Sequence, residues 1–174
     1  MAKLNLIDCD YKRVKKGKEE VEIATVEIHQ MVQAVVDKYC GELDKLLEGI
    51  REVLFSDKDN ELTSAELDRI VLKLPLLIYF GGAGQEYVGL QEDVAKFARQ
   101  LEFSKHFNNA AGTIADKTNY AETKVNEEEA VRVIYSRAYK IIRGKMEMAL
   151  ELLQSAKKVI SRRMGEQNVP EDNR

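Results

Sequence analysis

The feature that most constrains the fold is an unbroken apolar stripe near the C-terminal end of the sequence. Ten successive positions at helical spacing are apolar, and the mean step between them is about 3.7 residues. They are Val131, Tyr135, Ala138, Ile142, Met146, Ala149, Leu153, Ala156, Ile160 and Met164. A step this close to the α-helical period predicts one long helix that is straight or coils weakly to the right and ends at Gly165.

A helix of roughly 38 residues is about 57 Å long, whereas a compact domain of 174 residues has a radius of gyration near ~16 Å. Part of the apolar stripe would then extend beyond its own core. We therefore expect it to meet the first long helix of the chain and also a second copy of the chain. The expected contacts between copies are Tyr135, Ile142, Met146, Leu153 and Ile160. The alternative is an up-and-down bundle without a surplus face.

A second long helix is predicted from about Thr25 onwards. Its apolar positions recur at steps of three and four residues. They are Ile28, Val32, Val35, Tyr39, Leu43, Leu46, Ile50 and Val53. Residues 1–18 are expected to form an extended or mobile basic arm, with a possible short strand from Leu4 to Ile7. The predicted fold is an all-α, elongated helical bundle: one helical domain over 1–164, followed by a polar tail over 165–174.

The middle of the sequence carries helix signals and two apparent breaks. Thr63, with Glu66 three residues later, has the pattern of a capping box that begins a helix. Pro75 predicts a kink, because proline lacks the backbone donor that a helix interior uses. The GGAG sequence at 81–84 is expected to be a turn between two helices.

Residues 107–130 are rich in small and polar side chains. Two interpretations remain open for this segment. The favoured one is a connector whose small residues let another helix approach closely. The other is a hydrated surface in which Lys117 and its polar neighbours contact phosphates or a base. Asn126 with Glu129 resembles another capping box, which would start the final helix.

Charge is distributed unevenly along the sequence. The net charge is −3, yet residues 131–164 contain nine Lys or Arg and only two acids. A second basic cluster, Lys12, Arg13, Lys15, Lys16 and Lys18, lies in the N-terminal arm. Such zones could hold a polyanion locally, or they could solvate helices and pair with acidic surfaces of neighbouring subunits.

Several classes of protein fit the sequence poorly. The longest apolar run, Leu74 to Phe80, is too short to span a bilayer, and the N-terminus lacks a signal-peptide core. A soluble, cytoplasmic protein is therefore expected. Cys9 and Cys40 form no CxxC pair, and neither histidine has a partner at ligand spacing, so we expect no metal and no cofactor. No nucleophile–base pairing is evident, and an enzyme is not expected.

One family resemblance follows from the order of features over residues 90–164. A basic helix, AKFARQLEFSKHF, leads into a small polar stretch, GTIADKTNYAE. The long terminal helix then begins VIYSRAYKIIRGK and carries further cations late in its course. This order resembles the UvsY-type recombination mediators of tailed bacteriophages.

The resemblance implies a small, helical, oligomeric protein that binds single-stranded DNA and performs no bond chemistry. Such mediators assist a RecA-like recombinase on strands covered by single-strand-binding protein, here in the bacterial host cytoplasm if the chain is phage-encoded. Lys96, Arg99 and Lys105 would contact phosphates. Physically, the basic arm and Lys117 could add to such binding, since sequence-independent binding needs cations along a groove. The competing hypothesis is a phage protein-interaction module, an inhibitor of a host factor or an assembly component, without DNA binding.

Overall fold

The computed structural model describes residues 4–55 and 62–167, with side chains for residues 22, 24–55 and 62–166. Every element in these ranges is an α-helix, which confirms the all-α prediction. The helices are α1 (Leu4–Leu54), α2 (Ser64–Asn109), α3 (Ile114–Lys124) and α4 (Asn126–Gln167). The strand expected at Leu4–Ile7 is wrong, as is the extended arm, because α1 begins at Leu4. A lone strand would leave its backbone groups unpaired, whereas a helix pairs them internally.

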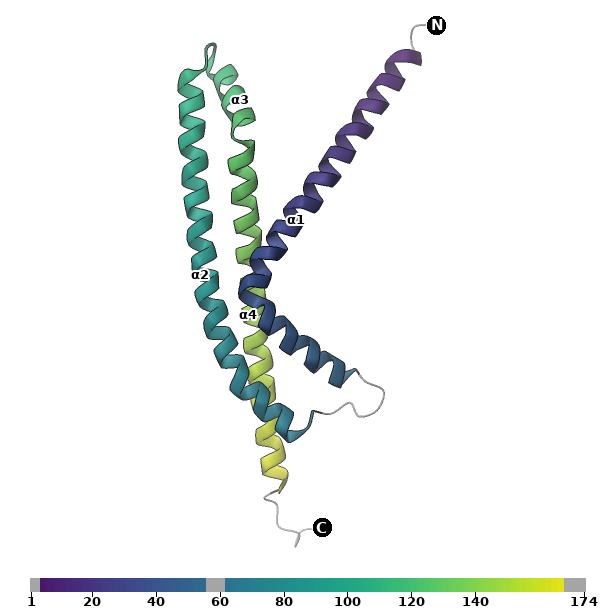
Figure 1. The fold of residues 1–174 in the computed structure, drawn as a ribbon, viewed down its shortest axis with the longest axis vertical. Helices are drawn as coiled ribbons and strands as arrows, with labels where there is room; N and C mark the ends of the chain where they lie inside the picture. The colour runs from purple at the N-terminus through teal and green to yellow at the C-terminus, as the bar shows by residue number, and fades with distance from the viewer. Residues whose placement is uncertain (1–3, 56–61, 168–174) are drawn as a thin grey trace.

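The helices α2 and α4 run antiparallel beside each other and form a tall hairpin (Figure 1). The 46 residues of α2 correspond to a rod of about 69 Å. The short helix α3 lies against the end of α2, at the top of the hairpin in Figure 1. It joins α2 to α4 and packs on α2 through the buried Ala121, whereas Ala111, Gly112 and Ala115 of the predicted connector are exposed.

The remaining helix, α1, crosses the hairpin and contacts both α4 and α2 (Figure 1). It changes direction at the crossing, and its N-terminal half points away from the hairpin. An ion pair between Asp44 of α1 and Lys145 of α4 lies at this crossing. The apolar stripe predicted for the first helix therefore faces the other helices, with Val32, Leu43 and Ile50 buried.

The hydrophobic core lies where α1, α2 and α4 meet. Its buried side chains contain no charged or polar group among the described residues. They include Val36, Cys40, Leu43, Ile70, Leu74, Val88, Ala138, Ile142, Met146 and Ala149. Burial raises the pKa of the Cys40 thiol, which is therefore held protonated in the core. Ala138 and Ala149 of α4 are fully buried in this cluster, where their small side chains leave room for close packing of the helices.

The GGAG segment is not a turn, contrary to the prediction from its sequence. It lies inside α2, which continues from Ser64 to Asn109. The glycines instead make room for side chains of other helices: Gly81 faces the Met146 thioether and Gly84 faces the Tyr39 ring. A run of glycines within a helix costs stability, but it permits a closeness that a Cβ would prevent. Close packing overrides the local signal for a turn.

The predicted start of α2 is confirmed. The hydroxyl of Thr63 accepts from the backbone N–H of Glu66 at 3.3 Å, and the Thr63 N–H donates to the Glu66 carboxylate at 2.8 Å. These bonds complete the capping box. Pro75 lies farther along the same helix, and the helix continues through it. Since Pro75 is exposed, the carbonyl that loses its helical donor can be hydrated.

The ends of α3 and α4 differ from the sequence prediction. Asn126 is the first residue of α4 and donates from its side chain to the carbonyl of Thr123, so it does not cap the helix. The capping box in this region belongs to Thr113 and Asp116, at the start of α3. Just before it, Gly112 has a φ of 111°, a conformation that favours glycine and turns the chain from α2 into α3. At the other end, α4 continues past Gly165 to Gln167.

Candidate interaction surface

The helix α2 is apolar on two opposite faces. Its inner face is buried against the rest of the chain through residues such as Leu67, Leu74 and Val88. Its other face carries nine large apolar side chains that are each more than half exposed, between 51% and 72%. We call these residues the outer stripe: Leu72, Leu76, Tyr79, Phe80, Tyr87, Leu90, Val94, Phe97 and Leu101.

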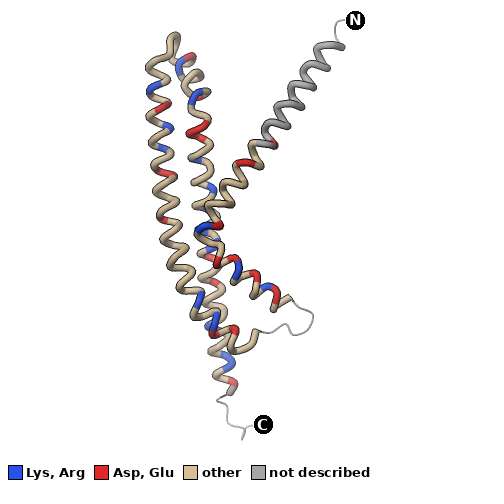
Figure 2. Tube along the Cα trace, viewed as in Figure 1, with Lys and Arg blue, Asp and Glu red and all other residues tan. Residues whose placement is uncertain are grey.

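The outer stripe follows one side of α2 over most of its length. Its members recur at steps of three and four residues, apart from Phe80, which lies beside Tyr79, and Ala83 fills the position between Tyr79 and Tyr87. Figure 2 shows a long uncharged stretch in α2, whereas the flanking segments carry alternating acids and bases. Monomeric proteins rarely leave so large a contiguous apolar patch in water. The outer stripe is therefore the strongest candidate for a binding surface in the described part of the chain.

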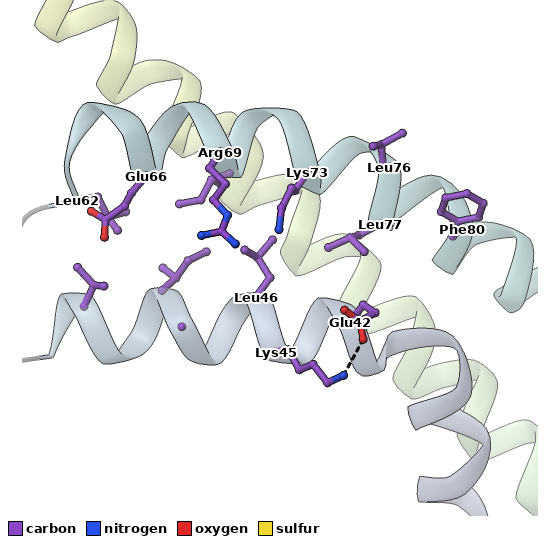
Figure 3. A pocket seen from close by; sticks show the side chains of 14 residues that line it. Glu42, Lys45, Leu46, Leu62, Glu66, Arg69, Lys73, Leu76, Leu77 and Phe80 are labelled. Atoms are coloured by element: carbon purple, nitrogen blue, oxygen red, sulfur yellow. Dashed lines mark hydrogen bonds and ion pairs between the residues drawn. The ribbon is translucent and has the colours of Figure 1, made fainter.

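A cleft of about 720 Å³ lies beside the outer stripe, between the C-terminal half of α1 and the first turns of α2 (Figure 3). Its lining combines apolar side chains, such as Leu46 and Leu77, with charged ones. Figure 3 shows Arg69 and Lys73 extending from α2 towards α1. A second set of lining residues, Leu76 and Phe80, also belongs to the outer stripe. The cleft and the stripe thus form one continuous apolar surface.

The α1 side of the cleft carries a local ion pair. Lys45 donates to the Glu42 carboxylate at 2.7 Å, as the dashed line in Figure 3 marks. This hydrogen bond holds the pKa of Glu42 below its ordinary value and raises the pKa of Lys45. Both side chains are about three-quarters exposed, so the pair contributes little to stability.

At the other end of the hairpin, Arg99 connects three helices. Its guanidinium on α2 pairs with Glu122 of α3 at 2.6 Å and with Glu129 of α4 at 2.8 Å. The hydrogen bond from Arg132 is the main cause of the lowered pKa of Glu129, and Arg99 adds to it. Arg99 is mostly shielded from water, with 28% of its side chain exposed. This arrangement fixes α3 between the ends of α2 and α4.

Among the described residues, the predicted DNA-binding cations of α2 all have acidic partners within the chain. Lys96 is paired with Glu92 at 3.1 Å and Asp93 at 3.2 Å, and Arg99 is used in the contacts between helices. Lys105 pairs with an acid one turn earlier in the same helix. Lys96 and Lys105 are nine residues apart, or about two and a half turns, so they lie on opposite sides of α2.

The other predicted DNA contacts give no further cluster. Lys117 lies over the ring of Phe107, with its ammonium 6.0 Å from the ring centroid. Lys12, Arg13, Lys15 and Lys16 have side chains outside the described residues. The cations that the structure describes therefore form no continuous basic groove on α2.

The residues predicted to join copies through the last helix are packed within the chain itself. Ile142, Met146 and Leu153 are buried in the core, and Tyr135 and Ile160 pack against it while partly buried. The surplus of this stripe is confined to its ends, where Val131 and Met164 are 44% and 58% exposed, and pairing of copies through α4 stays a prediction. The larger uncovered apolar face belongs to α2.

The outer stripe is hidden in the sequence by GGAG at 81–84, because these glycines predict a turn in the middle of the stripe. A break there divides the stripe into two short pieces that each resemble ordinary helix faces. Taken as one helix, residues 72–101 have apolar positions on both sides. Apolar positions on two opposite sides of one helix are the sequence signal that identifies the outer stripe.

The described residues offer neither a metal site nor a helix that could span a membrane. No group of three or more His, Cys, Asp or Glu side chains there could hold a metal ion. Among the described helices, none is both long and apolar enough to cross a membrane.

Comparison of the chain with protein-family models, with curated proteins and with solved structures finds no significant match.

Proposed function

We propose that this protein is a non-enzymatic, helical interaction protein that binds another polypeptide through the outer stripe of α2. The observation that carries the proposal is the set of nine exposed, large apolar side chains on a single helix face. Burying such a face gains about 25 cal/mol for each Å² of apolar surface removed from water. Aromatic residues such as Tyr79 and Phe97 are common at the energetic centre of protein interfaces.

The surrounding structure supports a rigid docking surface. The opposite face of α2 is anchored in the core by Leu74 and Val88, which are fully buried. The helix is held at one end by its Thr63 cap and at the other by Arg99. A side chain on the outer stripe is therefore presented on a fixed backbone, which reduces the entropy lost on binding.

Single-stranded DNA binding is a separate proposal, motivated by the family resemblance and by the basic sequence of the N-terminal arm. The described ion pairs of Lys96, Arg99 and Lys105 favour the protein-interaction function, because these cations already have acidic partners. A mediator would use cations that lie elsewhere, and the arm is the first place to test.

Site-specific photocrosslinking tests the interaction function directly. A photoreactive phenylalanine analogue at Phe97 places the probe on the outer stripe. The same analogue at Glu147, an exposed residue of α4, is the matched control. In cells that produce the protein, we expect polypeptide adducts from position 97 and few or none from position 147. If position 97 gives no adduct, or if both positions give the same adducts, the proposed function is wrong.

A further inference from the structure

We propose that the partner of the outer stripe is a second copy of this chain, and that two α2 helices pair antiparallel across a two-fold axis near Tyr87. This inference rests on the proposed function and names its partner. It differs from pairing through α4, because most of the α4 stripe is already covered within one chain.

With Ala83 counted, and apart from Phe80 and Tyr87, the spacing of the outer stripe matches itself when one copy is reversed. The positions 72, 76, 79 and 83 mirror the positions 101, 97, 94 and 90 about a centre between Glu86 and Tyr87. In an antiparallel pair, Leu72 faces Leu101, Leu76 faces Phe97, Tyr79 faces Val94 and Ala83 faces Leu90 of the other copy. Each of these layers occurs twice, as a two-fold interface requires.

The period of the stripe also suits a long, nearly straight contact. From Leu72 to Leu101 the mean step is about 3.6 residues, counting Ala83 in its place. That equals the period of an unstrained α-helix, so the stripe does not rotate away from a partner along its length of roughly 44 Å. Ala83 opposite Leu90 places a small side chain against a large one near the centre, which permits close packing.

The area of the stripe is that of a stable dimer interface. Nine large side chains, each more than half exposed, offer on the order of 800 Å² for burial on each copy. A standard specific interface buries about the same area on each partner. An accessory peptide shorter than the stripe would leave part of it in water, whereas a second α2 covers it from end to end.

The position of α1 favours the antiparallel arrangement over a parallel one. Within one copy, α1 meets α2 along the cleft and at Gly84 and Tyr87, next to Tyr39. Beyond this crossing α1 leaves the hairpin, so the later half of α2 has α4 and, near its end, α3 beside it, but not α1 (Figure 1). Antiparallel pairing sets the half of each copy that α1 borders against the half of the other copy that α1 leaves free.

Sedimentation of the purified full chain at micromolar concentration tests the pairing. We expect the wild-type protein to be a dimer, and Leu76→Glu to raise its dissociation constant about 100-fold or more, because each dimer then buries two carboxylates opposite Phe97. Met148→Glu is the matched control, since Met148 is an equally exposed apolar residue on α4. Circular dichroism should show the same helix content in all three proteins, because both substituted positions are exposed.

Disulfide crosslinking tests the orientation. In a Cys9→Ser background with Cys40 retained in the core, Leu72→Cys mixed with Leu101→Cys should give a crosslinked dimer. Neither protein alone should do so. A crosslink formed by Leu72→Cys alone would show parallel pairing and overturn the inference.

The results separate this inference from the proposed function. A wild-type protein that sediments as a monomer at micromolar concentration, or a Leu76→Glu variant that dimerises like wild type, overturns the self-pairing. If position 97 nevertheless crosslinks to a different polypeptide in cells, the interaction function stands and only the identity of the partner changes. An adduct with the mass of two copies supports both.

Discussion

Gly84 of α2 lies directly against the ring of Tyr39 of α1. A Cβ placed on Gly84 would come within 2.6 Å of the Tyr39 Cγ and within 2.8 Å of its Cβ. Non-bonded carbon atoms essentially never approach this closely, so any side chain at residue 84 must push the ring or the helix away. The glycine therefore sets how closely α1 can approach α2.

Replacing Gly84 with alanine should destabilise the protein by about 1–3 kcal/mol, since a methyl group overpacks the crossing of the two helices. The measurement is the free energy of unfolding in urea. Gly82→Ala is the matched control: it lies two residues away in the same helix, and its Cβ would have open space. That change should stabilise the helix by up to about 1 kcal/mol. Equal effects of the two substitutions would contradict the close approach.

The cluster around Arg99 predicts how stability depends on pH. The pKa of Glu129 is lowered from its ordinary value of 4.5, chiefly by the hydrogen bond from Arg132. Because the folded-state pKa is depressed, the carboxylate's contribution is present above pH 4.5 and is lost as the pH falls through the folded value. The melting temperature of the wild type should therefore fall more steeply below pH 4.5 than that of Glu129→Gln.

The control for this pH experiment is Glu147→Gln, also on α4. Glu147 pairs with Arg143 at 2.9 Å, but both side chains are about 60% exposed, so water screens the pair. We expect Glu147→Gln to leave the acid dependence of the melting temperature unchanged. A Glu129→Gln protein with the full acid dependence of the wild type would show that other carboxylates dominate.

Structural features that depend on residues close together in the sequence are predicted well. The stripe from Val131 to Met164 gave α4 with nearly correct bounds, and Thr63 with Glu66 gave the start of α2. Such features follow from helical periodicity and from hydrogen bonds within one turn, so the sequence contains all the groups that decide them.

Features that depend on distant residues were predicted poorly. Whether Gly81 and Gly84 end a helix or admit a neighbour is decided by Met146 and Tyr39, which are far away in sequence. Likewise, whether Ile142 faces a partner or its own core depends on how α1 and α2 fold over α4. Periodicity identifies an apolar face but not what covers it. The large apolar face that no other helix covers is the outer stripe of α2.

The ion pairs of Lys96 make a prediction about nucleic acid. Because Glu92 and Asp93 already neutralise its charge, Lys96→Ala should leave the affinity for a single-stranded oligonucleotide within about twofold. Fluorescence anisotropy at two salt concentrations would measure it. The comparison is a protein in which Lys12, Arg13, Lys15 and Lys16 are replaced by alanine, which should lose affinity if the mediator resemblance holds. A tenfold loss of affinity from Lys96→Ala alone would show that Lys96 leaves Glu92 and Asp93 to bind phosphate.

Truncation of one residue in the core and one on the outer stripe should separate folding from association. Ile142 is fully buried, so Ile142→Ala should lower the free energy of unfolding by about 3 kcal/mol at every protein concentration. Leu76 is 60% exposed, so Leu76→Ala should change it by less than about 0.5 kcal/mol in dilute protein, where the chain is monomeric. At high concentration the wild type gains stability from pairing, and Leu76→Ala should gain less. A loss from Leu76→Ala as large as that from Ile142→Ala in dilute solution would mean that the outer stripe is covered within the single chain.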